Sequence, residues 1–318
     1  MTAPLAAPLR VAVLGGTGFI GRVLCARLVE QGHEVLSLAR SVPADPPAGR
    51  FTSVDLSSTA PVELARLLDD ERIDAVVNAA GGMWGLTDEQ MYEANVVLVG
   101  RLVEAVAAMA APARLVHLGT VHEYGMAPIG TSQRESDTPA PVMEYGKLKL
   151  AATESVTRAV EAGLVRGVTL RLGNVVGAGQ PGHSLLGVMA AKLDGARLAG
   201  EPARLDLQPL TAQRDFVDLT DTVDAVLAAI AAPTTVPVIN VGTGSATAAR
   251  VLVDLLIEVS GVPVEVTEVP APAGSGPETE WQQMDTALAA AQLGWTSDRS
   301  LRQAVDSLWQ ARIASATS

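Results

Sequence analysis

The chain has 318 residues, of which 48% are apolar and 18% charged, and its formal net charge is −12. This length and apolar content allow a sizeable buried core and argue against intrinsic disorder. The acidic balance argues against nucleic acid and anionic membranes as main partners, because both would repel the protein. An anionic small molecule stays compatible with it, since a local pocket can be basic on an acidic protein.

Several absences in the sequence bear on location and on metals. The stretch from Met1 to Pro8 lacks a basic leader, and no apolar run is long enough to cross a membrane uninterrupted. The single cysteine, Cys25, cannot form an intramolecular disulfide and is expected to be buried. No cluster of His, Cys or Asp has metal-ligand spacing. We therefore expect a soluble, cytoplasmic protein without a metal site.

Short β-rich runs alternate with longer helical patterns in the first half of the chain. The predicted strands are Val11–Leu14, Glu34–Leu38, Ala75–Asn78, Arg114–Leu118 and Val168–Leu172. The predicted helices are Phe19–Gln31, Val62–Leu68, Glu89–Met109 and Tyr145–Glu161. This alternation predicts an α/β fold, with a parallel sheet covered by helices on both faces.

A glycine pattern follows the first predicted strand. Gly15, Gly18 and Gly21 are spaced Gly-x-x-Gly-x-x-Gly between a strand and a helix. Glycines placed this way permit a tight turn, close backbone approach to a pyrophosphate, and close helix–strand packing. The first amides of the following helix then point at the phosphates. The residues expected to form this part of a dinucleotide site are Gly15, Thr17, Gly18, Phe19, Ile20 and Gly21.

The end of the second strand bears on the identity of the dinucleotide. An NAD enzyme usually places an acid here to bond the ribose 2′-hydroxyl, whereas this chain continues with Arg40 and Ser41. Arg40 could bind a 2′-phosphate, so NADP(H) is favoured over NAD(H); a solvated arginine is the alternative. Asp55 and Leu56 are expected to border the adenine, although Asp55 could instead cap a turn.

Two residues one helical turn apart suggest proton-transfer chemistry. Tyr145 and Lys149 begin a predicted helix and face the same way. A nearby ammonium is expected to lower the pKa of the Tyr145 phenol, which could then exchange a proton with a carbonyl or alcohol oxygen. Thr120 follows the fourth strand and could hydrogen-bond the same oxygen. The alternative is an ordinary amphipathic helix with a solvated lysine.

After Leu172 the regular alternation loosens and Gly and Pro accumulate. The helices expected here are Leu185–Asp194, Thr222–Ala231, Val251–Val259, Asp285–Gln292 and Leu301–Ile313. The strands expected here are Phe216–Leu219 and Val238–Val241, and Pro270–Pro277 reads as a loop. This part shows too little regular structure to predict an independent core.

Taken in order, these motifs resemble those of extended short-chain dehydrogenases/reductases, in the nucleotide-sugar epimerase/dehydratase/reductase superfamily. The matching segments are VAVLGGTGFIG, VVNAAG, NVVLVGRLVEA, HLGTVHEYG, YGKLK, RLGNVVGAG, QRDFVDLTDTVDAV, INVGTG and LGW. The resemblance implies a Rossmann-type doubly wound parallel sheet, a smaller C-terminal α/β substrate-binding domain, and often a homodimer. We expect 1–172 and 215–241 to form the NADP-binding domain, and 173–214 and 242–318 the substrate domain.

The resemblance also implies further site residues. Those on the cofactor side are Asn78, Ala79, Ala80, Gly81, Asn95 and Leu172. Those on the substrate side are Asn174 and a diphosphate-binding Arg214, although a turn asparagine and an ion pair with Asp215 or Asp218 are the alternatives. By position in the chain, Met83, Trp84 and His122 are further substrate-side candidates. Loop packing is the alternative for Met83 and Trp84, and a surface position for His122.

Residues that the motifs lack argue against some of the reactions known in this superfamily. Val121 and His122 occupy the positions where dehydratases carry Asp-Glu, and the acid typical of NAD-retaining epimerases is missing. The best fit is an NADPH-dependent ketoreductase, most like those acting on dTDP-4-keto-6-deoxyhexoses in natural-product pathways. An epimerase with bound NAD and a non-catalytic dinucleotide sensor are the alternatives. A third, reduction of a non-sugar ketone, stays open because Leu207–Leu210 and Val176–Gly179 depart from the family pattern.

Overall fold

The computed structural model describes residues 7–270 and 280–315, and its main sheet has seven parallel strands. The strand order is β10-β6-β5-β4-β1-β2-β3. The strands are β1 (Arg10–Leu14), β2 (Glu34–Ala39), β3 (Arg50–Ser53), β4 (Ala75–Asn78), β5 (Arg114–Thr120), β6 (Arg166–Leu172) and β10 (Val238–Val241). The order reverses between β1 and β4, which opens a crevice at their carboxyl ends. The predicted Rossmann-type fold is confirmed, and β3 is a strand that the sequence pattern did not reveal.

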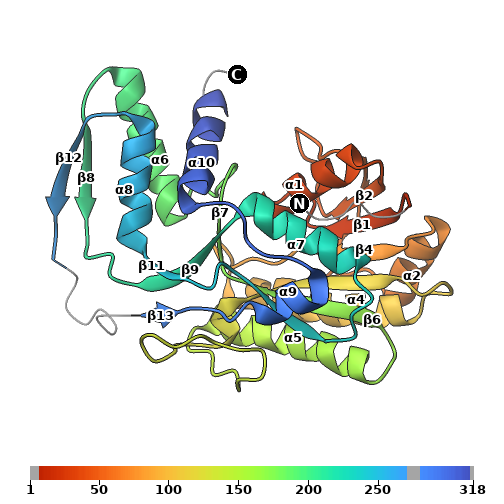
Figure 1. Ribbon diagram of the computed structural model, residues 1–318. Helices are drawn as coiled ribbons and strands as arrows, with labels where there is room; N and C mark the ends of the chain where they lie inside the picture. The colour runs from red at the N-terminus through yellow and green to blue at the C-terminus, as the bar shows by residue number, and fades with distance from the viewer. Residues whose placement is uncertain (1–6, 271–279, 316–318) are drawn as a thin grey trace.

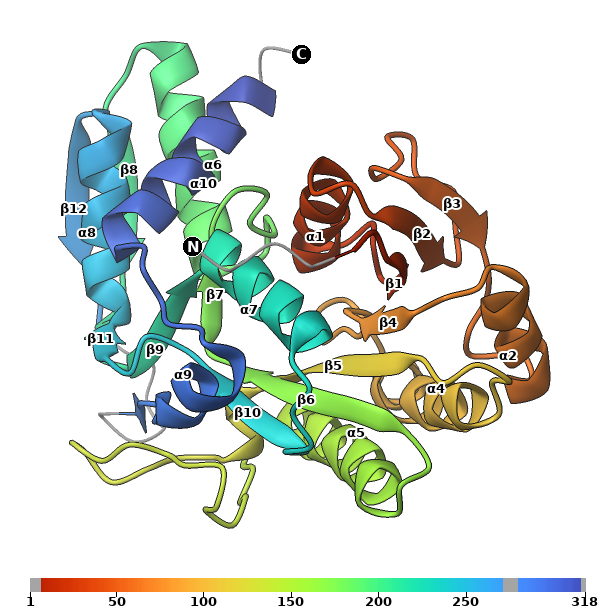
Figure 2. The same cartoon turned by 45° about the vertical axis from the view of Figure 1, so that its right-hand side comes forward.

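Helices cover both faces of this sheet (Figure 2). One face is covered by α1 (Phe19–Glu30) and α7 (Leu219–Ala231), and the other by α2 (Pro61–Asp70), α4 (Leu98–Ala107) and α5 (Glu144–Glu161). Both cores are built mainly from Val, Leu and Ala, in keeping with the 3% aromatic content. Cys25 is fully buried in the first core, as expected, and its burial raises the pKa of the thiol to about 12.

The predicted helix Glu89–Met109 is interrupted by a wide turn. It consists of α3 (Asp88–Tyr92), a π-helical turn η1 (Glu93–Val97), and α4. Thr87 caps its start, because its hydroxyl accepts a hydrogen bond from the Gln90 backbone amide at 3.2 Å. Turns of the π type are frequent at functional sites, and this one carries Asn95.

A second group of elements packs beside the Rossmann sheet (Figure 1). It consists of α6 (Leu185–Ala199), α8 (Ala249–Ser260), α10 (Leu301–Ser315) and the paired strands β8 (Ala203–Leu207) and β12 (Val264–Glu268). Their buried residues form a separate cluster that includes Leu193, Leu205 and Trp309. The expectation that this part lacks a core of its own was therefore wrong. Its two strands were missed because they pair with each other across about 60 residues of sequence, which leaves no local signal.

A small four-stranded sheet lies between these two groups. It contains β7 (Asn174–Val176), β9 (Gln213–Asp218), β11 (Ala246–Ala248) and β13 (Trp281–Gln282). The predicted strand Phe216–Leu219 corresponds to β9 and ends one residue early, because Asp218 caps α7. Its carboxylate accepts hydrogen bonds from the amides of Thr220 at 2.7 Å and Asp221 at 3.1 Å.

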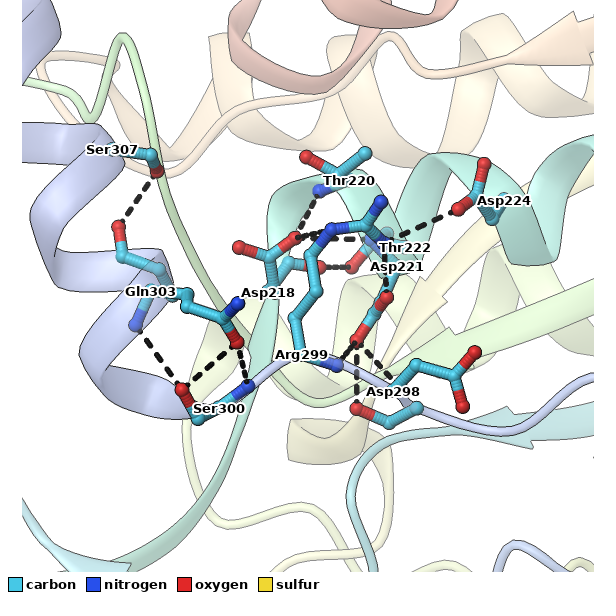
Figure 3. Close-up of polar contacts among 12 residues, drawn as sticks. Asp218, Thr220, Asp221, Thr222, Asp224, Asp298, Arg299, Ser300, Gln303 and Ser307 are labelled. Atoms are coloured by element: carbon cyan, nitrogen blue, oxygen red, sulfur yellow. Dashed lines mark hydrogen bonds and ion pairs between the residues drawn. The ribbon is translucent and has the colours of Figure 1, made fainter. Parts of the chain in front are cut away.

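A partly buried ion-pair network ties α7 to the segment that leads into α10 (Figure 3). The Asp221 carboxylate accepts hydrogen bonds from the Ser297 hydroxyl at 2.9 Å and from the backbone amides of Asp298 and Arg299 at 3.1 and 2.9 Å. The Arg299 guanidinium pairs with Asp221 at 2.5 Å and with Asp224 at 3.3 Å. Residues 75 to 78 positions apart are thereby held together.

The remaining predictions concern the end of the chain and membranes. The predicted helix Asp285–Gln292 is α9 (Ala287–Leu293), packed against β10. Of the predicted loop Pro270–Pro277, only Pro270 lies within the described residues. No helix in the described part of the chain is both long and apolar enough to span a membrane.

Candidate active site

The turn between β1 and α1 is packed too closely for side chains. Gly15 has a φ of 76°, in the left-handed region that favours glycine. A Cβ added to Gly21 would lie 2.2 Å from the Gly15 carbonyl oxygen. No side chain caps the start of α1 at Gly18, so the helix presents uncapped amides at this turn. These features fit the pyrophosphate of a dinucleotide.

A cavity of about 200 Å³ opens beside this turn, at the carboxyl ends of β4, β5 and β6. The predicted site residues that line it are Ile20, Ala79, Ala80, Gly81, Thr120, Tyr145, Lys149 and Leu172. The other lining residues are Gly82, Leu118, Gly119, Gly173 and Val175. Ligand pockets usually measure about 300–1,000 Å³, so this cavity can enclose reacting groups and not a whole dinucleotide. The structure thus brings the three predicted catalytic side chains into one space.

A hydrogen bond holds the side chain of Lys149 at the wall of the cavity. Lys149 lies one turn after Tyr145 on α5, is 4% exposed, and donates a hydrogen bond from Nζ to the Leu118 carbonyl oxygen at 2.6 Å. Burial lowers the pKa of Lys149 to about 8, while the nearby Glu123 carboxylate opposes that shift.

The expectation that Tyr145 has a lowered pKa was wrong for this structure. Burial, reinforced by the negative charge of Glu123, raises the pKa of the Tyr145 phenol to about 12. Burial is the larger of these two causes, and both act in the same direction. Tyr145 is therefore protonated at neutral pH, the form that donates a proton.

Asn95 contacts the loop that borders the cavity. Its side-chain amide donates to the carbonyl oxygens of Gly82 at 2.7 Å and Met91 at 2.8 Å. Its Oδ1 is buried without a hydrogen-bond partner among the described residues. A Cβ on Gly81, which has a φ of 142°, would lie 2.8 Å from this oxygen. The unpaired acceptor therefore lies directly behind the cavity lining.

Asn78 supports the turn through Ala79 and Ala80 that follows β4. Its Oδ1 accepts a hydrogen bond from the Ala80 amide at 3.1 Å, and its Nδ2 lies 3.0 Å from Nδ1 of His117. Both side chains are fully buried, and burial lowers the pKa of His117 well below its usual value. Asn78 thus holds the turn through Ala79 and Ala80 and does not itself line the cavity.

The predicted adenosine end of the site lies at the carboxyl ends of β2 and β3. Arg40 and Ser41 follow β2 and are exposed, and the Arg40 carbonyl accepts a hydrogen bond from the Ser53 hydroxyl at 2.7 Å. Asp55 caps its own turn, accepting from the Ser57 hydroxyl at 2.7 Å and amide at 3.1 Å. Leu56 is buried in the core under α2, whereas Thr17 and Phe19 are half-buried at the β1–α1 turn.

Arg214 forms an ion pair with Glu280, a residue that the sequence did not single out. The alternative partners considered for it, Asp215 and Asp218, are engaged elsewhere, in hydrogen bonds to Thr243 and in the α7 cap. The Nε atom of Arg214 is buried without a hydrogen-bond partner in the described part of the chain. The guanidinium of Arg214 is thus only partly satisfied by protein groups.

His122 is half-buried, which contradicts the alternative of a surface loop histidine. Its ring lies edge-on to Tyr145, with centroids 6.4 Å apart, and its Nδ1 is 3.4 Å from the side-chain nitrogen of Gln282. Burial, together with the charge of Arg214, lowers the pKa of His122 to about 4. His122 is therefore neutral at pH 7 and lies next to Tyr145.

The other substrate-side candidates are less central. Asn174 donates a hydrogen bond to the Asp215 carbonyl oxygen at 3.2 Å and does not line the cavity, although its neighbours Gly173 and Val175 do. Met83 is half-buried, and Trp84 is 60% exposed with its ring 5.5 Å from that of His183. Both Met83 and Trp84 lie just outside the cavity lining.

Two charged residues behind the cavity were missed by sequence reasoning. Glu123 is fully buried and pairs with Arg171 at 2.7 Å. The available signal was a charged residue inside an apolar strand, since Arg171 interrupts the β6 pattern. A buried charge needs a partner, and such a strand arginine predicts one.

The fold and this constellation define an NAD(P)-dependent oxidoreductase of the extended short-chain dehydrogenase/reductase type. Similarity to known proteins gives the same answer. The chain belongs to the NAD dependent epimerase/dehydratase family, whose model matches residues 11–242.

Three relatives illustrate the range of the similarity. The dTDP-6-deoxy-L-talose 4-dehydrogenase (NAD(P)(+)) of Kitasatospora kifunensis is 75% identical over 312 residues, covering 98% of each chain. A UDP-glucose 4-epimerase of Streptomyces lividans is 28% identical over 94% of each chain. The structure of MoeE5 in complex with UDP-glucuronic acid and NAD has a TM-score of 0.81 and 27% identity, covering 96% of this chain and 99% of that one.

Proposed function

We propose that this protein transfers hydride to the 4-keto group of a dTDP-linked 6-deoxyhexose, with Tyr145 as proton donor. The observation that carries this proposal is the meeting of Thr120, Tyr145 and Lys149 in one cavity beside the dinucleotide turn. The nicotinamide ring, when bound, supplies the hydride. Oxidation of the alcohol is the reverse reaction and uses the same groups.

Each of the three side chains has a separate task in this reaction. The keto oxygen gains negative charge as hydride arrives, and the protonated Tyr145 phenol donates its proton to it. The Thr120 hydroxyl hydrogen-bonds the same oxygen, which stabilises the developing charge. Lys149, held by its bond to the Leu118 carbonyl, supplies a positive charge in the cavity that Tyr145 also lines.

NADP(H) is the proposed cofactor in preference to NAD(H). The β1–α1 turn fits a pyrophosphate, which NADP(H) and NAD(H) have in common. The preference between the two cofactors therefore depends on the residues near the 2′-position of the adenosine ribose. Arg40 and Ser41 are exposed where β2 ends, and neither is a carboxylate that would repel a phosphate. Thermal-shift titrations test this, because a ligand that binds the folded state raises the melting temperature. NADP is expected to raise it more than NAD at equal concentration, and the opposite ranking would refute the preference.

The substrate proposal is supported by the 75% identical relative, whose name specifies dTDP-6-deoxy-L-talose. Arg214 is proposed to bind the diphosphate, and its unpartnered Nε supports that role. His122 is proposed to contact the sugar near the reacting carbon, with Met83, Trp84 and Asn174 further out. The family resemblance also supports a homodimer, which sedimentation of the purified protein tests.

The decisive measurement is nicotinamide absorbance with a dTDP-4-keto-6-deoxyhexose and, in reverse, with dTDP-6-deoxy-L-talose. Tyr145→Phe removes the proton donor and is expected to lower kcat by roughly 10²–10⁴-fold. Tyr92→Phe is the matched control, because Tyr92 is 50% exposed on α3 and should leave turnover unchanged. Full activity of Tyr145→Phe would refute the mechanism, and release of an epimerised sugar without net cofactor change would favour an epimerase.

A further inference from the structure

The Thr120 turn is built around the side chain of Glu123. Thr120 ends β5, and Val121–Glu123 form a 3-10 turn, η2, directly after it. The Thr120 amide donates a hydrogen bond to Oε1 of Glu123 at 2.9 Å, and the His122 amide donates to the Thr120 hydroxyl oxygen at 3.4 Å. The Glu123 carboxylate therefore holds the backbone of the turn that carries the Thr120 hydroxyl.

The same carboxylate connects this turn to two neighbouring elements. From α5, the Thr153 hydroxyl donates to Oε1 of Glu123 at 3.0 Å. From β6, Nε of Arg171 donates to Oε2 at 2.7 Å, and the Arg171 guanidinium lies 4.4 Å from the centre of the Tyr124 ring. Thr153 is one helical turn beyond Lys149, so Glu123 links the Thr120 turn to the helix that carries the proton-transfer pair.

The carboxylate also lies close behind the cavity wall. Gly119 lines the cavity, and a Cβ added to it would be 2.6 Å from Oε1 of Glu123. Glu123 and Arg171 are 0% and 5% exposed, so water screens their charges poorly. The negative charge of Glu123 raises the pKa of Tyr145 and opposes the lowering of the pKa of Lys149.

Other titratable groups facing this cluster contribute less to its charge. Burial lowers the pKa of both His117 on β5 and His122 on η2, so both are neutral at pH 7. Burial raises the pKa of the Tyr124 phenol, and of Glu135, which accepts from the Asn240 amide. Among these described neighbours, Glu123 is the acid whose charge acts on both Tyr145 and Lys149.

We propose that Glu123 is a positioning residue, whose buried carboxylate fixes the Thr120 turn to helix α5 and stabilises the Lys149 ammonium. This inference deepens the proposed function and rests on it for the role of Thr120. The effect on Lys149 is a property of the protein alone and can be tested without substrate.

The chain has three lysines, Lys147, Lys149 and Lys192, so NMR of ¹³C-labelled lysine side chains can follow each one through a pH titration. In Glu123→Gln the titration midpoint of Lys149 is expected to fall by about one pH unit, while Lys147 and Lys192 stay unchanged. Lys149→Arg assigns the signal. The double variant Glu123→Gln/Arg171→Met avoids an unpaired buried arginine and is expected to shift Lys149 in the same direction.

Asp221→Asn is the matched control, because Asp221 is also a buried, ion-paired carboxylate but its hydrogen-bond partners lie in the segment that leads into α10. It is expected to lower stability and leave the Lys149 midpoint unchanged. In the kinetic assay, both Glu123 variants are expected to lose kcat roughly ten- to a hundredfold, with the KM for NADPH retained. An unchanged Lys149 midpoint in both Glu123 variants would overturn the inference, whereas absence of wild-type turnover would count against the proposed function alone.

Discussion

At the scale of single residues, Lys149 makes the site sensitive to pH. Its folded-state pKa is about 8, below the value of about 10.4 for a free lysine. The ammonium is therefore lost as the pH rises through about 8, and kcat/KM for ketone reduction is expected to fall above that pH. Initial rates from pH 6 to 10 measure this, and a flat profile would contradict a role for the charge.

The lowered pKa of Lys149 affects stability in the direction opposite to its effect on activity. Between about pH 8 and 10.4 the unfolded chain holds the lysine proton and the folded chain does not. Stability contributed by this residue therefore rises with pH across that window. The effect of Lys149 on stability therefore does not account for a loss of activity in that window.

Glu280 competes with the substrate diphosphate for Arg214, the residue proposed to bind that diphosphate. It is paired with Arg214, and both side chains are about 30% exposed. An incoming diphosphate has to replace this carboxylate and is also repelled by it. Glu280→Gln is expected to lower the KM for the sugar nucleotide several-fold, with kcat little changed. Glu265→Gln, at an exposed ion pair on β12, is the control, and a raised KM in Glu280→Gln would show that Glu280 instead orients Arg214.

At the scale of elements, the β1–α1 turn can form only with glycine at its closely packed positions. Gly21→Ala would place a methyl group 2.2 Å from the Gly15 carbonyl oxygen, so α1 has to shift away from β1. Cofactor binding is expected to weaken by at least tenfold, measured by isothermal titration with NADPH. Gly195→Ala on α6 is the control, because nothing lies within 4 Å of the added methyl group. It should gain roughly 0.5–1 kcal/mol of stability and bind NADPH normally.

The accuracy of the sequence analysis also differs from element to element. Strands β1, β4, β5 and β6 were predicted because buried parallel strands are continuous apolar runs. Strands β8 and β12 were missed because pairing between segments about 60 residues apart leaves no local signal. The π-helical turn η1 was missed for a similar reason: its residues keep a helical pattern, and its widening is visible only in the backbone.

At the scale of the whole molecule, the Asp221–Arg299 network ties the Rossmann part to the segment entering α10 (Figure 3). Asp221→Ala leaves Arg299 with fewer partners. It also removes the carboxylate that accepts four hydrogen bonds from residues 297–299. The free energy of unfolding is expected to fall by about 3–5 kcal/mol, measured by urea denaturation. A loss below about 1 kcal/mol would place the network among ordinary surface ion pairs.

The sequence by itself determined the fold class, the glycine turn after β1 and eight of the residues that line the cavity, among them Thr120, Tyr145 and Lys149. It could do so because these depend on local patterns: apolar runs, glycine spacing and a one-turn helical repeat. Tertiary structure alone decided the charges around the reacting groups. The partners Glu123–Arg171 and Arg214–Glu280 are 48 and 66 residues apart, and burial, which raises the pKa of Tyr145, exists only once distant segments exclude water.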